Sequence, residues 1–279
     1  MHKKSFYALD ICIKMRYTSS RSMENKSNDD FEEENKMKKL FALMLALAMM
    51  LTAAAASAES LKVGLNTEFA PFEYVDDDGK ITGFDVELIT AIAEKMGMEV
   101  EIENMYFDGL LGALTSKMVD CLCTGMTITE ERKASVDFAD PYFTATQAVV
   151  VLKDNDTIHS IDDLKGKKAA VQDGTTGHFM AQDDLGCDVS DTVYKAATDA
   201  ALDVVNGRAD CMIIDDAVAQ NLVKKYDTLT ILEGMDMPVE EYGIAVNKDS
   251  AELLTKINEA LAAVKEDGTY DALIAKYFN

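Results

Sequence analysis

Residues 61–65 read LKVGL, residues 85–96 read DVELITAIAEKM and residues 100–103 read VEIE. The first and third segments are short runs rich in apolar and β-branched residues, which is typical of strands. The middle segment spaces its apolar residues at helical intervals and stops before Gly97, a residue that commonly ends helices. This strand–helix–strand order predicts a βαβ unit in a mainly parallel sheet.

The same alternation continues along the chain and then begins again, so we expect two α/β halves. In the first half the pattern predicts a helix at 107–117 and a strand at 120–124. The second half has expected strands at 168–171, 193–195 and 211–214, and expected helices at 176–183 and 198–206.

Two extended apolar segments, 147–152 and 242–246, stand where the chain would cross between the halves. We interpret them as paired hinge strands, with helices in 249–278 returning to the first half. The predicted lobes are therefore 59–147 together with 243–279, and 148–242. A ligand of such a fold binds in the cleft at the carboxyl ends of the strands.

A targeting segment precedes these elements. Residues 37–39 are Met-Lys-Lys, residues 40–51 are apolar, and residues 56–58 are Ala-Ser-Ala, which together predict a signal peptide at 37–58. A retained signal anchor is the alternative. Residues 1–36 are polar and patternless, and we interpret them as a non-native upstream extension. Because no cysteine follows the cleavage site for lipid attachment, we expect a free periplasmic protein.

The chain carries 27 Lys and Arg against 50 Asp and Glu, a formal net charge of −23. Such a charge repels nucleic acid, so we expect no nucleic-acid partner. Four cysteines follow the signal peptide: Cys121, Cys123, Cys187 and Cys211. In an exported chain they permit a disulfide, but buried free thiols are the alternative.

The segment after the expected strand 120–124 concentrates polar groups near a strand end. It contains Thr124, Gly125, Met126, Thr127 and Arg132. The Arg132 guanidinium is suited to bidentate binding of a carboxylate. The alternative is that the segment simply opens a helix and leaves Arg132 in solvent.

Two further segments follow strands of the second half. Thr175 and Thr176 lie between a strand and a helix, where free backbone N–H groups favour an anion, although an ordinary capped helix is the alternative. Asp215 follows the strand 211–214 and is suited to binding a ligand ammonium. Its neighbour Asp216 competes for that role, and both residues have helix capping as an alternative.

Two aromatic residues, Phe69 and Phe107, stand near the ends of the first two strands. Such rings are able to clamp the aliphatic part of a ligand side chain, although aromatic residues at these places are often core. The mature chain offers no serine-nucleophile elbow and no His/Cys metal spacing, so we expect no metal and no cofactor.

At these residues the chain resembles the polar amino-acid binding proteins of ABC importers, solute-binding protein family 3. The resemblance covers the whole mature length and its motifs occur in the family order. The matching segments are FAPFEY (69–74), GFDVEL (83–88), FDGL (107–110), GMTITEER (125–132), VDFADPY (136–142), DLKGK (163–167), GTTG (174–177) and DGTY (267–270).

The resemblance implies a two-lobed periplasmic binding protein-like fold of type II. It further implies that Arg132 holds the ligand carboxylate with help from backbone groups of Thr127 and Thr176. By the same resemblance Asp215 binds the ammonium together with Thr124 and Thr127. The partners so implied are a free L-α-amino acid and the permease subunits of an ABC importer, and we expect a monomer.

The resemblance also implies roles for residues around the ligand side chain. Phe69 and Phe107 stack over it, and Asn66 and Gln172 contact its distal end. Relatives selective for basic amino acids often have an acid where Asn66 stands, so glutamine is favoured narrowly over arginine, lysine or cystine. Glu68 lies nearby and keeps a preference for arginine or lysine open.

Two other functions remain as alternatives. A dehydratase acting on cyclic carboxylates on the same fold would need a placed acid or base, and His178, near Thr176, is the candidate group. A ligand-sensing input domain would need a further span or signalling module after the expected lobes.

Overall fold

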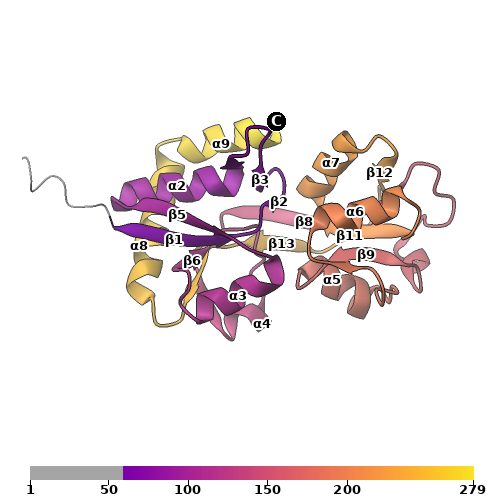
Figure 1. Ribbon diagram of the computed structural model, residues 1–279, viewed down its shortest axis with the longest axis horizontal. Helices are drawn as coiled ribbons and strands as arrows, with labels where there is room; N and C mark the ends of the chain where they lie inside the picture. The colour runs from indigo at the N-terminus through magenta and orange to yellow at the C-terminus, as the bar shows by residue number, and fades with distance from the viewer. Residues whose placement is uncertain (1–58) are drawn as a thin grey trace, which may run out of the picture. The chain divides into compact units, whose positions relative to one another are not determined.

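The computed structural model describes residues 59–279. The predicted upstream extension (1–36) and signal peptide (37–58) lie outside the described residues. Within 59–279, no helix combines the length and the apolar character needed to cross a bilayer. This part of the chain builds two large sheets with helices packed on them and one small three-stranded sheet, so the predicted α/β fold class with two lobes is confirmed (Figure 1).

The first sheet has the strand order β5-β1-β6-β14-β7. Its strands are β1 (Ser60–Leu65), β5 (Glu99–Asn104), β6 (Cys121–Leu122), β7 (Val136–Phe138) and β14 (Ala245–Asn247). β1 is parallel to both β5 and β6, whereas β14 runs antiparallel between β6 and β7. Helices α2 (Phe84–Met96) and α3 (Phe107–Thr115) make the two crossovers that the sequence pattern predicts.

Apolar side chains at alternate positions explain why β1 forms. Leu61, Val63 and Leu65 are fully buried, while the intervening Lys62 is exposed. In α2 the buried side chains recur at helical spacing and cover one face, and Gly97 ends the helix with a left-handed backbone (φ 72°). The result is a helix packed on the first sheet.

The second sheet has the order β10-β9-β11-β8-β12, and β13 pairs with the first half of β8. Its strands are β8 (Phe143–Leu152), β9 (Ala169–Gln172), β10 (Val193–Tyr194), β11 (Cys211–Asp215), β12 (Leu229–Ile231) and β13 (Val239–Tyr242). Its helical elements are η1 (Ile161–Leu164), α5 (Thr176–Phe179), η2 (Met180–Asp184), α6 (Ala197–Val205) and α7 (Asp216–Lys225).

The chain passes between the sheets twice, at 139–142 and at 243–244. The expected crossing segment 147–152 lies wholly inside the second sheet, because the long apolar strand β8 continues between β11 and β12. β8 and β13 do pair antiparallel, with Tyr242 opposite Phe143. The lobe boundaries at 147/148 and 242/243 stay a prediction.

The last two helices, α8 (Ala251–Glu266) and α9 (Thr269–Phe278), pack against α2 (Figure 1). Ile257, Leu261 and Val264 of α8 are buried in the same apolar cluster as Phe84 and Leu88 of α2. Burial of these side chains against one another joins the end of the chain to its first lobe.

Several elements differ from the sequence prediction. The expected strand 120–124 is confined to β6, because the chain turns at Gly125, and Gly125 and Thr127 lie at the cleft. The expected helix 176–183 changes from α to π geometry at Met180. The small sheet of β2 (Glu68–Phe69), β3 (Glu73–Val75) and β4 (Ile81–Thr82) is too short to show a periodic signal.

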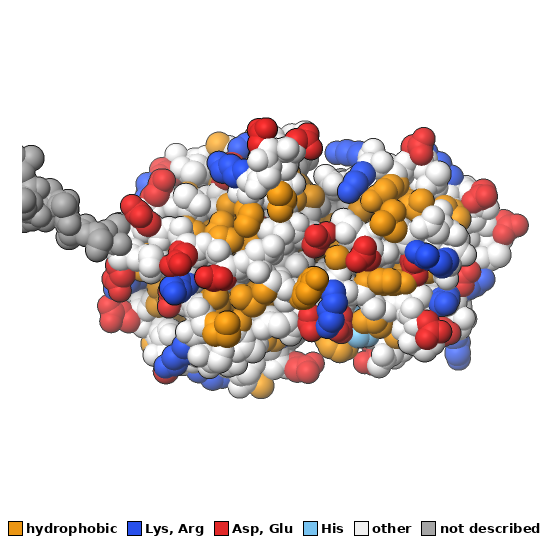
Figure 2. Space-filling view, viewed as in Figure 1, with side chains coloured by type: hydrophobic (Ala, Val, Ile, Leu, Met, Phe, Trp, Pro, Cys, Tyr) orange, Lys and Arg blue, Asp and Glu red, His pale blue; other side chains and the backbone are white. Residues whose placement is uncertain are grey.

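Acidic side chains are spread over both lobes on the face shown in Figure 2, with basic side chains among them. This distribution matches the excess of Asp and Glu in the composition.

Candidate functional site

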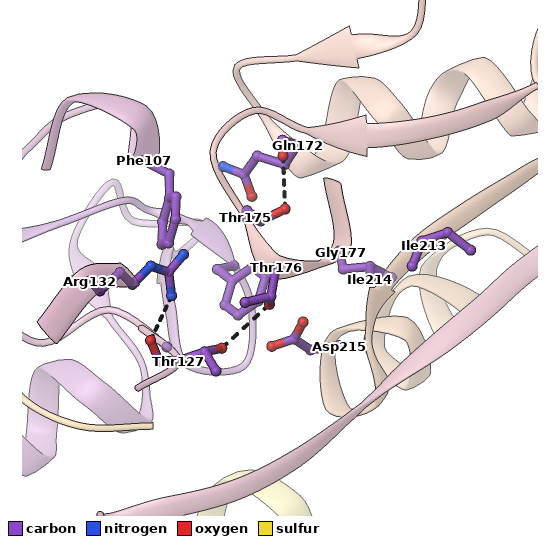
Figure 3. A pocket seen from close by; sticks show the side chains of 12 residues that line it. Phe107, Thr127, Arg132, Gln172, Thr175, Thr176, Gly177, Ile213, Ile214 and Asp215 are labelled. Atoms are coloured by element: carbon purple, nitrogen blue, oxygen red, sulfur yellow. Dashed lines mark hydrogen bonds between the residues drawn. The ribbon is translucent and has the colours of Figure 1, made fainter. Parts of the chain in front are cut away.

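A small cavity lies between the two lobes and encloses about 20 Å³ (Figure 3). That volume accommodates about one water molecule, so the lobes lie against each other. The residues that line it come from both lobes: Phe69, Phe107, Gly125, Thr127, Arg132, Gln172, Thr175, Thr176, Gly177, Ile213, Ile214 and Asp215.

Arg132 reaches across the junction from the short helix α4 (Glu130–Lys133). Thr129 caps this helix by accepting a hydrogen bond from the Arg132 backbone N–H (3.1 Å). The guanidinium donates to the carbonyl of Thr127 on the first lobe (2.7 Å) and to that of Gly174 on the second (3.1 Å). It also lies 5.4 Å from the centre of the Phe107 ring, a cation–π distance. Arg132 is therefore a buried cation and is not left in solvent.

Asp215 ends β11 and faces Arg132 from the other lobe (Figure 3). Its carboxylate accepts from Gln147 Nε2 (2.5 Å) and from the Tyr242 hydroxyl. Burial, followed by the nearby charge of Glu240, raises the pKa of Asp215 to about 7. The neighbouring Asp216 instead accepts from the Ala217 N–H in the first turn of α7 (2.8 Å), so Asp215 is the acid at the cavity.

The predicted turn before α5 also lies at the cavity. The Thr175 hydroxyl caps α5 by accepting from the His178 N–H (3.1 Å), as the capping alternative predicts. The Thr176 hydroxyl lies 3.5 Å from that of Thr127, on the opposite lobe. This turn therefore caps α5 through Thr175 and contacts the first lobe through Thr176.

Three predicted residues do not line the cavity, whereas the other nine do. Asn66 is buried behind it and accepts from Gln172 Nε2 (2.9 Å). The Thr124 hydroxyl accepts from the Asn66 N–H (3.1 Å) and donates to Glu73 (2.7 Å). The Met126 side chain packs in the apolar core of the first lobe.

Two residues at the lobe junction escaped the sequence analysis. Glu240 accepts from the hydroxyls of Thr127 (2.6 Å) and Thr176 (2.9 Å), which belong to different lobes. Gln147 donates toward Asp215 and toward Glu240 (3.2 Å). Burial alternates along β13: Glu240 and Tyr242 are buried, and Val239 and Glu241 are exposed. This period of two is a signal that would have found Glu240.

Further contacts between the lobes lie nearer the surface. Glu68 accepts from the Thr198 hydroxyl (2.7 Å). Lys195 lies between Asp108 of the first lobe (2.5 Å) and Asp173 of the second (2.8 Å). Glu68 was a candidate for recognising basic ligands. Its carboxylate already accepts a hydrogen bond from Thr198 of the opposite lobe.

His178 does not reach the cavity. Its Nδ1 accepts from the Gly174 N–H (3.3 Å), and the ring stacks on Phe179. Among the described residues that line the cavity there is no histidine, so His178, the group suggested for a dehydratase, lies outside it. All four cysteines within 59–279 are buried and free, so the disulfide alternative is not formed.

Residues 61–279 match the model of the bacterial extracellular solute-binding proteins, family 3. The chain belongs to this family. The match covers both lobes and every residue of the cavity, so the resemblance seen in the motifs and the type II binding-protein fold are confirmed.

Individual relatives agree with this membership. The L-cystine-binding protein TcyJ of Escherichia coli (strain K12) is 37% identical over 78% of this chain and 82% of its own length. A solved ancestral arginine-binding protein bound to arginine is 44% identical, with a TM-score of 0.74, over 79% of this chain and 98% of its own. An ancestral amino acid-binding protein described as a precursor of cyclohexadienyl dehydratase is 40% identical, with a TM-score of 0.74. The match covers 79% of this chain and 96% of that protein.

Replacing Asp215 by Asn is expected to stabilise the ligand-free protein more at pH 8 than at pH 5. The folded chain keeps a proton on Asp215 up to about pH 7, whereas the unfolded chain releases it near pH 4. The stability that this proton contributes is lost as the pH rises through 7, and asparagine has no proton to lose. Urea unfolding at both pH values should show a difference on the order of 2 kcal/mol.

An Asp215→Asn effect of equal size at pH 5 and pH 8 would show that Asp215 is ionised throughout this range.

Proposed function

We propose that the protein is the extracytoplasmic substrate-binding component of an ABC importer and captures a free L-α-amino acid between its lobes. The observation that carries this proposal is the placement of Arg132 and Asp215 on opposite sides of one cavity (Figure 3). A buried cation and a buried acid facing each other match the carboxylate and the ammonium of an amino-acid zwitterion.

In this proposal the Arg132 guanidinium binds the ligand carboxylate. Its contacts with two backbone carbonyls use two of its five donors, so donors remain for a carboxylate. Backbone N–H groups at the Thr175–Thr176 turn add to this end of the site. Asp215 takes the ammonium, whose positive charge favours the ionised carboxylate and counteracts the raised pKa.

Binding requires the lobes to separate and close again. An amino acid does not fit into about 20 Å³, so contacts that now join the lobes must open to admit it. Glu240 supports the closed state, because its carboxylate accepts from Thr127 and Thr176 only when the lobes are together. Such closure around a ligand gives the importer a shape that differs between the empty and the loaded protein.

The charges at the junction bear on which amino acid is bound. Asp215 and Glu240 provide two buried carboxyl groups against the single guanidinium of Arg132. A ligand with a cationic side chain would balance these charges, and we therefore propose L-arginine. Gln172, which lines the cavity, and Asn66 behind it form a neutral pair that supports glutamine, the ligand that the sequence favours narrowly.

Replacing Arg132 by Ala should weaken amino-acid binding about 100-fold or more. The variant removes the partner of the ligand carboxylate and leaves that charge buried without compensation. Isothermal titration calorimetry with L-arginine and L-glutamine measures the change. Arg208→Ala, which removes an exposed arginine paired with Asp203, is the control and should bind normally. Unchanged affinity in Arg132→Ala would refute the assigned site.

The same titrations on the unaltered protein compare the two ligands. We expect L-arginine to bind at least about 10-fold more tightly than L-glutamine, because burying a further positive charge beside two carboxyl groups is favourable. Tighter binding of glutamine would show that the amides Asn66 and Gln172 decide specificity. An assay for dehydration of a cyclic carboxylate should give no turnover.

Glu240→Ala should shift the protein toward the open state and weaken binding about 10-fold or more. The hydroxyls of Thr127 and Thr176 then lose the acceptor that they share between the lobes. Energy transfer between one dye on each lobe reports the closed fraction. Glu241→Ala is the matched control, since Glu241 is the exposed next residue of β13. Equal closure in both variants would rule out a role for the Glu240 carboxylate.

A further inference from the structure

Two acidic side chains, Glu73 and Asp85, lie fully buried inside the first lobe behind the cavity. Glu73 belongs to β3 and Asp85 to the first turn of α2. Neither carboxyl group is paired with a lysine or arginine among the residues 59–279. Two adjacent carboxylates without a cation cannot both stay ionised in a buried place, so the pair needs another source of stability.

In each of the two carboxyl groups, one oxygen accepts hydrogen bonds from the described residues and the other does not. Glu73 Oε1 accepts from the Thr124 hydroxyl (2.7 Å), and Asp85 Oδ2 accepts from the Gly125 N–H (2.6 Å) and the Tyr142 hydroxyl (2.6 Å). The second oxygen of each group, Glu73 Oε2 and Asp85 Oδ1, is buried with no donor within 59–279. One proton held between these two oxygens would satisfy both at once.

The surroundings decide which group holds that proton. Burial raises the pKa of Asp85 to about 6, while hydrogen bonds from Tyr142 and the Gly125 N–H act in the opposite direction and favour its ionised form. Within the described part of the chain, Glu73 accepts a hydrogen bond from the Thr124 hydroxyl alone. Burial and then the charge of Asp85 hold the pKa of Glu73 well above its ordinary value.

The other titratable groups around the pair are neutral. Tyr142 and Cys123 are in contact with Asp85, while Tyr242 and Tyr270 lie further out. Burial is the largest cause of the raised pKa of all four, and the charge of Asp85 adds to it, so they keep their protons at neutral pH.

The pair supports the wall of the ligand site directly. Thr124 and Gly125 are the residues that it binds, and Gly125 lines the cavity. Gly125 takes a left-handed backbone (φ 51°) and approaches the Phe69 ring so closely that a Cβ would lie 2.8 Å from it. Thr124 in turn accepts from the Asn66 N–H.

We propose that Glu73 and Asp85 share a single proton, with Glu73 as the donor, and that this pair positions the Thr124–Gly125 turn of the binding site. Both are positioning residues, since they act through Thr124 and Gly125 and lie outside the cavity. The consequence for binding rests on the function proposed above, whereas the shared proton does not.

The test compares Glu73→Gln with the unaltered protein. Glutamine donates an N–H to Asp85 permanently and still accepts from Thr124, so it should replace the proton at every pH. Infrared difference spectra at pH 7 should show the band of a buried protonated carboxyl group that is lost in Glu73→Gln. Absence of that band from the unaltered protein would overturn the proposal.

The pH dependence of folding gives a second readout. A raised pKa means that the folded chain holds a proton that the unfolded chain releases above about pH 4.5, so stability falls as the pH rises. Between pH 5 and 7 the folding equilibrium constant of the unaltered protein should fall up to about tenfold per pH unit relative to Glu73→Gln. Parallel pH profiles would contradict a proton on Glu73.

Binding of L-arginine tests whether the Glu73–Asp85 pair positions the ligand site. We expect Glu73→Gln to bind within about threefold of normal. Glu73→Leu, which removes the acceptor of the Thr124 hydroxyl and the proton shared with Asp85, should bind at least tenfold more weakly. Glu87→Gln, on the outer side of α2, is the control and should bind normally. Normal binding by a folded Glu73→Leu would refute positioning. If the unaltered protein fails to bind L-arginine, the proposed ligand is wrong, while the spectra and pH profiles still decide the shared proton.

Discussion

Charge removed from water needs either an opposite charge or several hydrogen bonds, and this constraint governs the junction between the lobes. Arg132, Asp215 and Glu240 are all buried there. Arg132 finds its acceptors on both lobes, and Glu240 finds its donors on both. Separating the lobes returns each group to water, so the free energy of closing the cleft is tied to how these groups are paired. A zwitterion that offers new partners of the correct sign changes that free energy directly.

The parts of the structure that local sequence patterns describe were predictable. Apolar alternation located β1 and β5, helical spacing located α2, and the position of Arg132 and Asp215 after strands placed them in the cleft. These predictions succeed because the carboxyl ends of the parallel strands, β1, β5 and β6 in one sheet and β9 and β11 in the other, face the junction.

The residues that were missed depend on contacts between distant segments. Glu240 meets Thr127 across 113 positions, and Glu73 meets Thr124 across 51. Nothing in the neighbourhood of an acidic residue in a sequence tells which hydroxyl it will meet. Met126 is the opposite case, a residue predicted in the site that lies outside it. It stands between two cavity residues, yet the turn at Gly125 directs its side chain into the core.

The order of strands in the first sheet has a consequence for how the chain acquires its structure. β14, which lies between β6 and β7, comes from residues 245–247, and the helices packed on α2 come later still. The second sheet uses one uninterrupted stretch, 143–242. During synthesis from the first residue to the last, the sheet that starts earlier is therefore completed later. Until residues 245–247 are available, the edges of β6 and β7 lack their common neighbour, so the first lobe reaches its final form only near the end of synthesis.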